Sequence, residues 1–422
     1  MPTPSLLIVP ARFKTGKLYS QIPTSGSGDF TVTRNTEARR VGPDGLIASV
    51  ASGIPRLDYY TSGGTAGCPA LLVEPAATNG ILNSTDTTTS WTLGANLTSG
   101  AIDVIGVSGN NLTVAVSGSG IGSAAGRFVR FNNNVALASG STYTVSFLMK
   151  KTGAHTIGGY QLTMSSGVVG SGFDVSGSFA SGSNVDTAPT TNRIRRIERF
   201  GTDVFRCSET FTMTAAATGT HLAFGPVSAV SVSTNSAVGT TMGFAAPQLE
   251  LGSVPTSFIP TTAGTGSRSA DVVSVSGAVS GSIGQTEGVL YIECESNNGE
   301  DDVFNINRSA ANAITVYKNA NNSYLGRIYH SSTSIIFTSA SGVTGTVKIA
   351  IAYKSGDSTM YLNGSRVGTL NTTAITFGAA LNYLGVDKSS AFFSGIKPSR
   401  IRAVALYTTR LTDAELATLT TL

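Results

Sequence analysis

The fold class follows from one stretch near the C-terminus, Val347-Lys-Ile-Ala-Ile-Ala-Tyr-Lys-Ser-Gly-Asp-Ser-Thr-Met-Tyr-Leu-Asn-Gly-Ser-Arg-Val-Gly-Thr369. Every second residue from Val347 to Tyr353 is apolar, which is typical of a half-buried antiparallel strand. Asn363-Gly364 suits a two-residue type I′ hairpin, because both of its positions need a positive φ. The stretch therefore predicts three strands joined as an antiparallel meander.

The end of the chain predicts a strand followed by a short helix. Apolar residues alternate from Ile401 to Tyr407. Thr412-Asp-Ala-Glu415 then forms a capping box, with Leu411 and Leu416 placed as a hydrophobic staple. We expect a helix to start at Asp413 and to pack Leu416 and Leu419 onto the sheet.

Composition extends this interpretation to the whole chain. Of 422 residues, 49 are glycine, 12% are charged and 41% are hydrophobic. Low charge with frequent glycine favours many short strands and tight turns, and the hydrophobic content argues against disorder. The net charge of +4 is small. Its one basic cluster, at Arg193, Arg195, Arg196 and Arg199, is interpreted as a solvated strand or loop face, not a nucleic-acid site.

The three cysteines make no disulfide framework. Cys207 and Cys294 lie in strand-like runs, where we expect buried free thiols. No secretory signal is evident, and no apolar run reaches the ~20 residues of a membrane-spanning helix.

The chain divides into three parts. Residues 1–80 hold eight of the 14 prolines, which predicts an extended attachment segment with few long ladders. Residues 81–262 and 270–422 are predicted to be two sandwiches, with a flexible linker at Ala263-Gly-Thr-Gly-Ser267 between them.

The middle part carries its own strand signals. Tyr143 to Met149 alternates, and so does Phe205 to Met213, where Glu209 interrupts the apolar face. We expect Glu209 to lie near an edge or in a polar pocket. Gln248 and Glu250 are interpreted as strand-pairing or core polar groups.

Several motifs resemble known families. The opening of many phage structural proteins is similar to Pro4–Pro10, Gly16–Ser20, Gly28–Asn35, Arg39–Ile47, Ile54–Tyr59, Cys68–Pro75 and Thr78-Asn79. Jelly-roll modules grouped with carbohydrate-binding domains are similar to Gly243–Thr261 and Arg268–Val273. Tyr361-Leu-Asn-Gly364 and Leu406–Leu416 resemble the laminin-G/concanavalin-like family. These resemblances imply an all-β fold, with the N-terminal segment followed by a jelly roll and a concanavalin-like sandwich.

Catalytic and metal sites receive little support. Retaining glycosidases need two carboxylates ~5–5.5 Å apart, and Glu293 and Glu295 share a strand face. However, the concanavalin-like E-x-D-x-x-E pattern is broken, with Glu295 second and Asn298 last. Glu300-Asp-Asp302 and Asp387 could ligate calcium, but solvated loop acids are the preferred interpretation. We predict no enzyme activity, no metal and no cofactor.

Glycan binding is the favoured chemistry, because aromatic rings offer apolar faces to sugars while amides fix hydroxyls. The candidates are Tyr317, Asn321, Asn322, Tyr324 and Tyr329. Core or cross-strand packing is the alternative for the three tyrosines.

The resemblances imply a fibre, spike or decoration subunit of a tailed phage. Such a protein would attach to other virion proteins through its N-terminal segment and display lectin-like sandwiches toward host-surface glycans. We expect a homo-oligomer, preferably a trimer, made in the host cytoplasm and released by lysis, with no nucleic-acid partner and no membrane insertion. Two alternatives stay open: an architectural capsid, collar or tail subunit without a ligand, and a glycan-degrading depolymerase.

Overall fold

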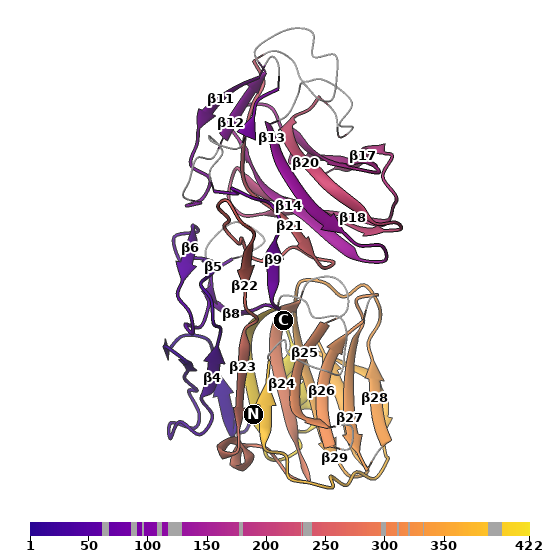
Figure 1. The fold of residues 1–422 in the computed structure, drawn as a ribbon. Helices are drawn as coiled ribbons and strands as arrows, with labels where there is room; N and C mark the ends of the chain where they lie inside the picture. The colour runs from indigo at the N-terminus through magenta and orange to yellow at the C-terminus, as the bar shows by residue number, and fades with distance from the viewer. Residues whose placement is uncertain are drawn as a thin grey trace.

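The structure is a computed structural model that describes residues 1–60, 67–85, 91–94, 97–107, 112–116, 129–176, 180–228, 230, 239–296, 301–309, 312–319, 321–331, 333–386 and 399–422. Two antiparallel β-sandwiches lie end to end, and the N-terminal segment runs up one side of the C-terminal sandwich to the base of the middle one (Figure 1). The all-β prediction is confirmed. In the described part of the chain, no helix is long and apolar enough to cross a membrane.

The middle sandwich consists of two six-stranded sheets. In spatial order, the first sheet contains β10 (Trp91–Thr92), β13 (Val129–Leu137), β20 (Ala217–Pro226), β15 (Ile157–Met164), β16 (Gly167–Asp174) and β17 (Ser181–Asp186). The second contains β11 (Leu97–Ala101), β12 (Leu112–Val116), β21 (Thr241–Leu251), β14 (Thr142–Lys151), β19 (Val204–Met213) and β18 (Thr190–Arg199).

Aromatic rings fill the space between these two sheets. The ring of Phe147 on β14 lies 4.7 Å from that of Phe224 and 5.8 Å from that of Phe173, centre to centre. Such pairs add to the free energy gained from burying the rings. The alternation predicted from Tyr143 to Met149 is therefore confirmed as a strand with one face in the core.

The C-terminal sandwich has a larger pair of sheets. The eight-stranded sheet contains β31 (Ser365–Asn371), β30 (Ser358–Leu362), β29 (Thr346–Lys354), β24 (Glu287–Ser296), β33 (Ser399–Tyr407), β8 (Ala70–Val73) and β7 (Leu57–Asp58), with β1 (Leu6–Ile8) also paired to β33. The nine-stranded sheet contains β2 (Phe13–Lys14), β3 (Lys17–Leu18), β4 (Phe30–Thr33), β23 (Val272–Ser276), β32 (Tyr383–Gly385), β25 (Asp301–Ser309), β26 (Asn312–Lys318), β27 (Tyr324–His330) and β28 (Thr333–Thr338).

Short elements complete the fold. Two two-stranded ribbons pair β5 (Ala38–Val41) with β6 (Ile47–Val50) and β9 (Ala77–Asn79) with β22 (Gly266–Arg268). A 3₁₀ helix, η2 (Ala278–Ser282), follows β23, and one α-helix, α1 (Asp413–Thr420), covers the outer face of the eight-stranded sheet.

The predicted division places residues 1–80 outside both sandwiches, and the strand pairing corrects this boundary. Leu6 pairs with Leu406, Leu71 with Ile401, and Val32 with Val273. Residues 1–80 thus supply strands to both sheets of the C-terminal sandwich. Their prolines stand between these short strands, where a missing amide donor costs no ladder hydrogen bond.

The two local predictions near the C-terminus are confirmed. Asn363 and Gly364 have φ of 48° and 82°, as a type I′ hairpin between β30 and β31 requires. Helix α1 begins with Thr412 as its N-cap, and the capping box with Glu415 is complete. Leu416 is fully buried and Leu419 is partly buried beneath the helix.

Candidate functional site

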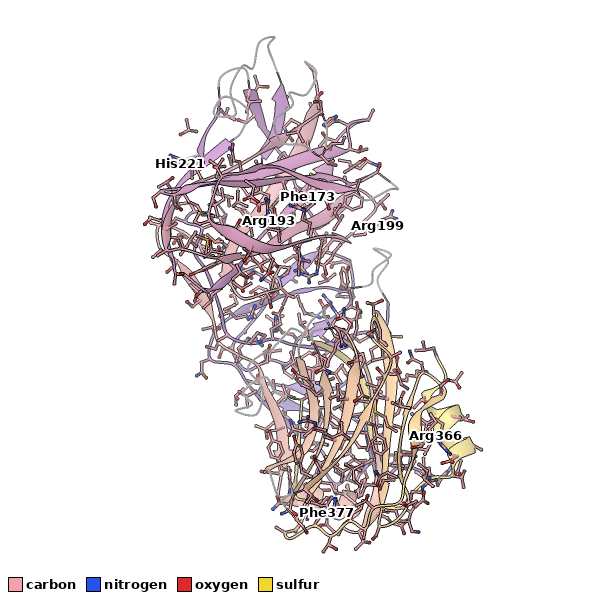
Figure 2. The ribbon with its side chains drawn as sticks, turned by 90° about the vertical axis from the view of Figure 1, so that its right-hand side faces the viewer. Phe173, Arg193, Arg199, His221, Arg366 and Phe377 are labelled. Carbon is pink, nitrogen blue, oxygen red and sulfur yellow. The ribbon has the colours of Figure 1, made fainter. Side chains whose placement is uncertain are left out.

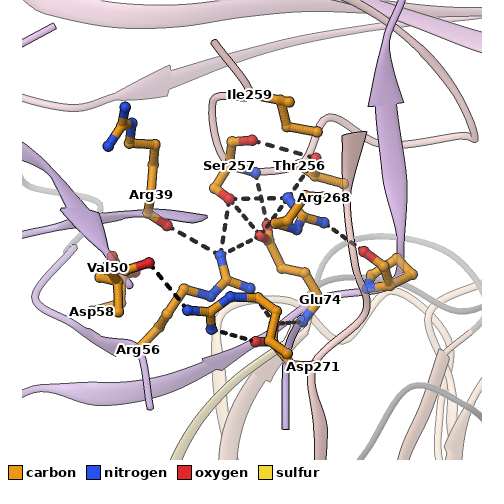
Figure 3. A network of polar contacts seen from close by, with 12 residues as sticks. Arg39, Val50, Arg56, Asp58, Glu74, Thr256, Ser257, Ile259, Arg268 and Asp271 are labelled. Atoms are coloured by element: carbon orange, nitrogen blue, oxygen red, sulfur yellow. Dashed lines mark hydrogen bonds and ion pairs between the residues drawn. The ribbon is translucent and has the colours of Figure 1, made fainter. Parts of the chain in front are cut away.

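A network of buried polar side chains lies where the two sandwiches meet (Figure 3). The guanidinium of Arg56, 1% exposed, donates to Glu74 Oε2 at 2.6 Å and to Ser257 Oγ at 2.9 Å. It also forms an ion pair with Asp271. Arg56 and Glu74 come from the N-terminal segment, whereas Ser257 and Asp271 lie on either side of the linker to the C-terminal sandwich.

Two more arginines complete this junction network, which we define as Arg34, Arg56, Glu74, Arg268 and Asp271. Arg268 Nη1 lies 2.9 Å from Glu74 Oε2, and Arg34 Nη1 lies 3.0 Å from Asp271 Oδ1. Burial alone would raise the pKa of Glu74, but the charges of Arg268 and Arg56 hold that pKa well below its ordinary value. The Glu74 carboxylate therefore remains ionised in the interior.

A column of stacked side chains crosses the junction beside this network. The Arg206 guanidinium lies 5.0 Å from the Phe200 ring, and the ring centres of Phe200 and Tyr60 are 4.8 Å apart. The Arg400 guanidinium lies 4.3 Å from the centre of the Tyr60 ring, and Arg400 Nε donates to Asp58 Oδ2 at 2.7 Å. Arg206 and Phe200 belong to the middle sandwich, Tyr60 to the N-terminal segment and Arg400 to β33. The cation–π and ring contacts of this column therefore stabilise the packing of all three parts.

The junction also explains several motifs quoted from the sequence. Gln248 and Glu250 are 2% and 1% exposed, and Gln248 Nε2 donates to Glu250 at 3.2 Å. Gln248 Oε1 in turn accepts from the amide of Ile259 at 2.5 Å. Their interpretation as core polar groups is confirmed.

A second buried ion site lies inside the middle sandwich. Glu209, fully buried, accepts from Tyr160 Oη at 2.7 Å and from Arg193 Nε at 2.5 Å, and Arg195 Nη2 lies 3.2 Å away. The predicted polar pocket around Glu209 is confirmed. In Figure 2, Arg193 lies in the body of the sandwich near Phe173, whereas Arg199 lies at its side.

The interpretation of the basic cluster as a solvated face therefore needs correction. β18 is an edge strand, so the side chains of Arg193 and Arg195 can turn inward toward Glu209. A buried carboxylate needs such partners, because an uncompensated charge in the interior is strongly destabilising.

The predicted glycan-binding residues fall on β26, on β27 and on the turn between them. Asn321 is exposed and Asn322 is half-buried with φ 61°. Asn321 Oδ1 accepts from Ser323 Oγ at 2.8 Å, and the backbone oxygens of Asn321 and Asn322 accept from Gly342 and Val343. These contacts hold the turn.

The three tyrosines do not come together. Tyr324 is fully buried in the inter-sheet core, with Lys318 Nζ 5.2 Å from its ring, so it cannot offer a face to a sugar. Tyr317 and Tyr329 lie on the outer face of the sheet, but Tyr317 pairs with Leu325 and Tyr329 pairs with Ala313. Ala313 and Tyr317 are four residues apart on β26, so the two tyrosines are separated by about 13 Å along the strands.

A residue that the sequence reasoning missed lies beside Tyr329. Arg327 is half-buried, and its Nη1 donates to Tyr329 Oη at 2.9 Å. Arg327 pairs with Ile336, which is 47% exposed, and with Thr315 on β26. The alternation of Leu325, Arg327 and Tyr329 on β27 was the available signal. We call Arg327, Tyr329 and Ile336 the outer-sheet patch.

The remaining candidates are placed as follows. Glu293 and Glu295 on β24 are half-buried; Tyr291 Oη lies 3.5 Å from Glu293, and Arg402 lies 4.0 Å from Glu295. Asp387 and Glu300 lie outside the described residues, as do the side chains of Asp301 and Asp302. Among described residues, no group of three His, Cys, Asp or Glu side chains could hold a metal.

The cysteine predictions can also be checked. Cys207 and Cys294 are fully buried free thiols, as predicted, and Cys68 is an exposed one. Burial raises the pKa of Cys207 well above its ordinary value, which keeps the thiol protonated and unreactive.

Fold and site together define an all-β protein of two sandwiches joined by a buried ion network. No protein-family model matches the chain. No curated protein matches it either. A Ruminococcus gnavus sialidase CBM40 bound to sialyllactose is 13% identical, with a TM-score of 0.28, over 33% of this chain and 84% of that one.

Two further solved structures show the same level of likeness. Domain 4 of the Geobacillus stearothermophilus arabinanase AbnA, in complex with arabinotriose, is 11% identical with a TM-score of 0.28, over 36% of this chain and 73% of its own. The binding domain of Paraclostridial Mosquitocidal Protein 1 is 10% identical with a TM-score of 0.28, over 36% and 43%. Values this low carry no functional conclusion.

Proposed function

We propose that this chain is a non-enzymatic adhesion protein of a phage particle, which displays its sandwiches toward host-surface glycans. The observation that carries the proposal is the junction network, because five buried charges hold the two sandwiches in one orientation. A fixed orientation suits a displayed subunit. Several copies held at defined positions raise the effective concentration of weak sites.

The outer-sheet patch is the proposed glycan-facing surface. Tyr329 offers part of a ring, Arg327 offers guanidinium donors, and Ile336 adds exposed apolar area. This mixture of an apolar surface with a few fixed polar groups suits a sugar.

The N-terminal segment is the proposed attachment surface, although it is built into the C-terminal sandwich. Large apolar side chains are exposed along it, with Val9 at 40%, Phe13 at 42% and Leu46 at 40%. Exposed apolar groups of this size favour contact with another protein when they gather in a patch.

Glycan adhesion is tested with the full chain, because a fragment of residues 270–422 would lack β1, β4, β7 and β8. Labelled protein is applied to a glycan array and to host cells. We expect saturable binding, and a loss of about tenfold in affinity for Tyr329→Ala if the patch contacts sugar. Tyr19→Ala is the matched control, because Tyr19 also lies beside cationic side chains but follows β3, at the other end of the nine-stranded sheet. Silence of the native protein on both surfaces would instead favour a purely architectural subunit.

The particle assignment is tested separately. Purified particles from the source culture are examined by mass spectrometry and by antibody labelling in the electron microscope. We expect the chain in regular copy number at one position on the particle. Absence from the particles would remove the phage assignment and leave glycan adhesion to be judged by the array.

A further inference from the structure

The nine-stranded sheet ends at β28, on the side of the C-terminal sandwich that lies away from the N-terminal segment (Figure 1). The sequence of this strand, Thr333-Ser-Ile-Ile-Phe-Thr338, holds no charged residue and no proline. Ile336 is 47% exposed on the outer face, whereas Ile335 and Phe337 are buried in the core. An edge strand with neither charge nor proline to protect it favours pairing with another strand.

The ladder with β27 shows which backbone groups of β28 face outward. Just beyond β28, the amide of Ser339 donates to the backbone oxygen of Tyr324 at 2.9 Å, so these two residues form a hydrogen-bonded pair. Such pairs alternate with non-bonded ones along an antiparallel ladder. The residues of β28 at the non-bonded positions are Ser334, Ile336 and Thr338. Their N–H and C=O groups therefore point away from β27, and these amides donate to no other segment that the structure describes.

Two other edge strands of the chain are protected where β28 is not. β18 carries arginines and Glu198, and its ladder with β19 contains a register shift. β31, at the edge of the eight-stranded sheet, carries Arg366, and its ladder with β30 is also shifted. The ladder between β27 and β28 is regular along its whole length. A regular, uncharged edge presents its backbone groups in the spacing that a partner strand needs.

We infer that β28 pairs with β28 of a second copy of this chain, antiparallel and about a two-fold axis at Ile336. Opposite residues of two antiparallel strands share a face, and only the outward N–H and C=O groups can bond across the new ladder. Placing Ile336 opposite itself satisfies both conditions, because Ser334 then meets Thr338. Ile335 meets Phe337 on the inner face, whereas a shift by one residue would put core side chains opposite exposed ones. The strand is therefore complementary to itself, as a two-fold contact requires.

Charge does not oppose this contact. The nearest cation on the same face is Arg327, which pairs with Ile336 across the ladder to β27. In the dimer the two β27 strands lie three strand spacings apart, about 14 Å. This separation exceeds the Debye length of about 8 Å at physiological salt, so the repulsion between the two arginines is largely screened.

Pairing of β28 also enlarges the outer-sheet patch. Arg327 and Ile336 of one copy continue directly into Ile336 and Arg327 of the second copy, in one row across the joined sheet. Each copy therefore contributes residues to one surface, which goes beyond the patch of a single chain. The association itself does not rest on glycan binding.

The expected contact is weak. One short strand pair buries less area than the ~1,200–2,000 Å² of a stable interface, so we expect a reversible dimer. Copies held on one particle reach effective concentrations of about 1 mM, at which a weak contact is sufficient. A three-fold assembly would need a different, heterologous contact.

The test is sedimentation velocity of the full chain in a concentration series up to about 1 mM, without any glycan. We expect a reversible monomer–dimer equilibrium. Ile336→Lys places two like charges at the axis and should raise the dissociation constant at least tenfold. Ser334→Pro removes an outward amide but no bond to β27, so it should fold and weaken the dimer about tenfold. Ile194→Lys is the matched control, because Ile194 is 49% exposed on the edge strand β18, and it should leave the dimer unchanged.

Each variant must keep the melting temperature of the native chain at the lowest concentration, and Ile336→Lys alone decides if Ser334→Pro does not fold. A native chain that stays monomeric up to about 1 mM overturns the inference. A dimer that Ile336→Lys leaves intact, or that Ile194→Lys weakens equally, overturns the assignment to β28. Growth beyond two copies overturns the two-fold register. A dimer with a silent glycan array removes glycan adhesion alone, whereas a positive array with a monomer removes only the dimer.

Discussion

The two sandwiches have similar architecture but are assembled from the chain in different ways. All strands of the middle sandwich that the structure describes come from one continuous stretch, Trp91 to Leu251. The C-terminal sandwich combines strands from residues 6–73 with strands from residues 272–407. Its core therefore forms only when distant segments meet, as when Leu6 pairs with Leu406. Closing so long a loop costs conformational entropy before any contact forms.

The cores differ as well. The core of the middle sandwich is rich in phenylalanine and tyrosine, and it buries the carboxylate of Glu209. The C-terminal core is mainly Ile, Val and Leu, and the buried ion pairs of Glu74 and Asp271 lie at its end, in the junction network. One sandwich is therefore complete in itself, whereas the other is completed by strands of the N-terminal segment.

The strongest test of this comparison separates the two sandwiches. We expect a fragment of residues 77–262 to fold alone, with a cooperative thermal transition by circular dichroism. A fragment of residues 270–422 should not, because it lacks β1, β4, β7 and β8 and exposes their apolar partners.

Adding residues 1–80 as a separate peptide is the control for this experiment. Recovery of a cooperative transition in the second fragment would support the missing-strand explanation. A fragment of residues 270–422 that folds alone would contradict the dependence proposed here.

The next largest effect is expected at the junction network. Arg56→Ala leaves Glu74 and Asp271 buried with less compensating charge, so we expect a loss of about 3–5 kcal/mol in the free energy of unfolding. Denaturant titration of the full chain measures it. Arg366→Ala is the control, because its ion pair with Asp413 lies at the surface, with side chains 35% and 38% exposed, and should contribute less than about 1 kcal/mol. Equal losses in the two variants would show that burial of the network contributes little.

The sequence allowed prediction of what is decided locally. The Asn363-Gly364 hairpin, the Thr412 cap and the alternating strands depend on residues a few positions apart, and each is confirmed. The incorporation of residues 1–80 was missed because pairing of Leu6 with Leu406 leaves no local pattern.

The candidate site was predicted less well, for a related reason. Tyr324 lies two residues after Asn322, whose positive φ changes the direction of the chain. The face on which β27 begins could therefore not be deduced from β26. Tyr324 and Ile328 lie on the inward side of β27, which is set by packing against the opposite sheet. This packing is not visible in the spacing of tyrosines and asparagines.

Acid should weaken the junction in a way that the Glu74 carboxylate controls. Its pKa is lowered in the folded chain, so its contribution is complete above the ordinary carboxyl pKa and is lost as the pH falls toward the folded value. We expect Glu74→Gln to be less stable than the native chain at pH 7 and to lose less stability between pH 5 and about pH 3. Denaturation midpoints across this range measure the difference.

Glu250→Gln is the matched control for the acid experiment. Burial raises the pKa of Glu250 above the ordinary carboxyl value. The contribution of Glu250 to the stability of the native chain is therefore present at low pH and is lost as the pH rises through the raised pKa. Removing it should leave the acid-induced loss at least as steep as in the native chain. A slope for Glu74→Gln that matches the native slope would contradict the role of Glu74.

The smallest expected loss of unfolding free energy comes from a substitution at the cap of helix α1, in the C-terminal sandwich. Thr412 Oγ1 accepts from the amide of Glu415 at 3.3 Å, and Thr412→Ala removes this cap. We expect a loss of about 1 kcal/mol, typical of an N-cap. If the two sandwiches unfold in separable calorimetric transitions, only the one that contains α1 should shift, because Leu416 packs on the eight-stranded sheet. If the junction instead makes the chain unfold as one unit, the single transition shifts as a whole, and Arg56→Ala combined with Thr412→Ala should split it in two. That double variant therefore measures how far the junction couples a self-contained sandwich to one assembled from distant segments.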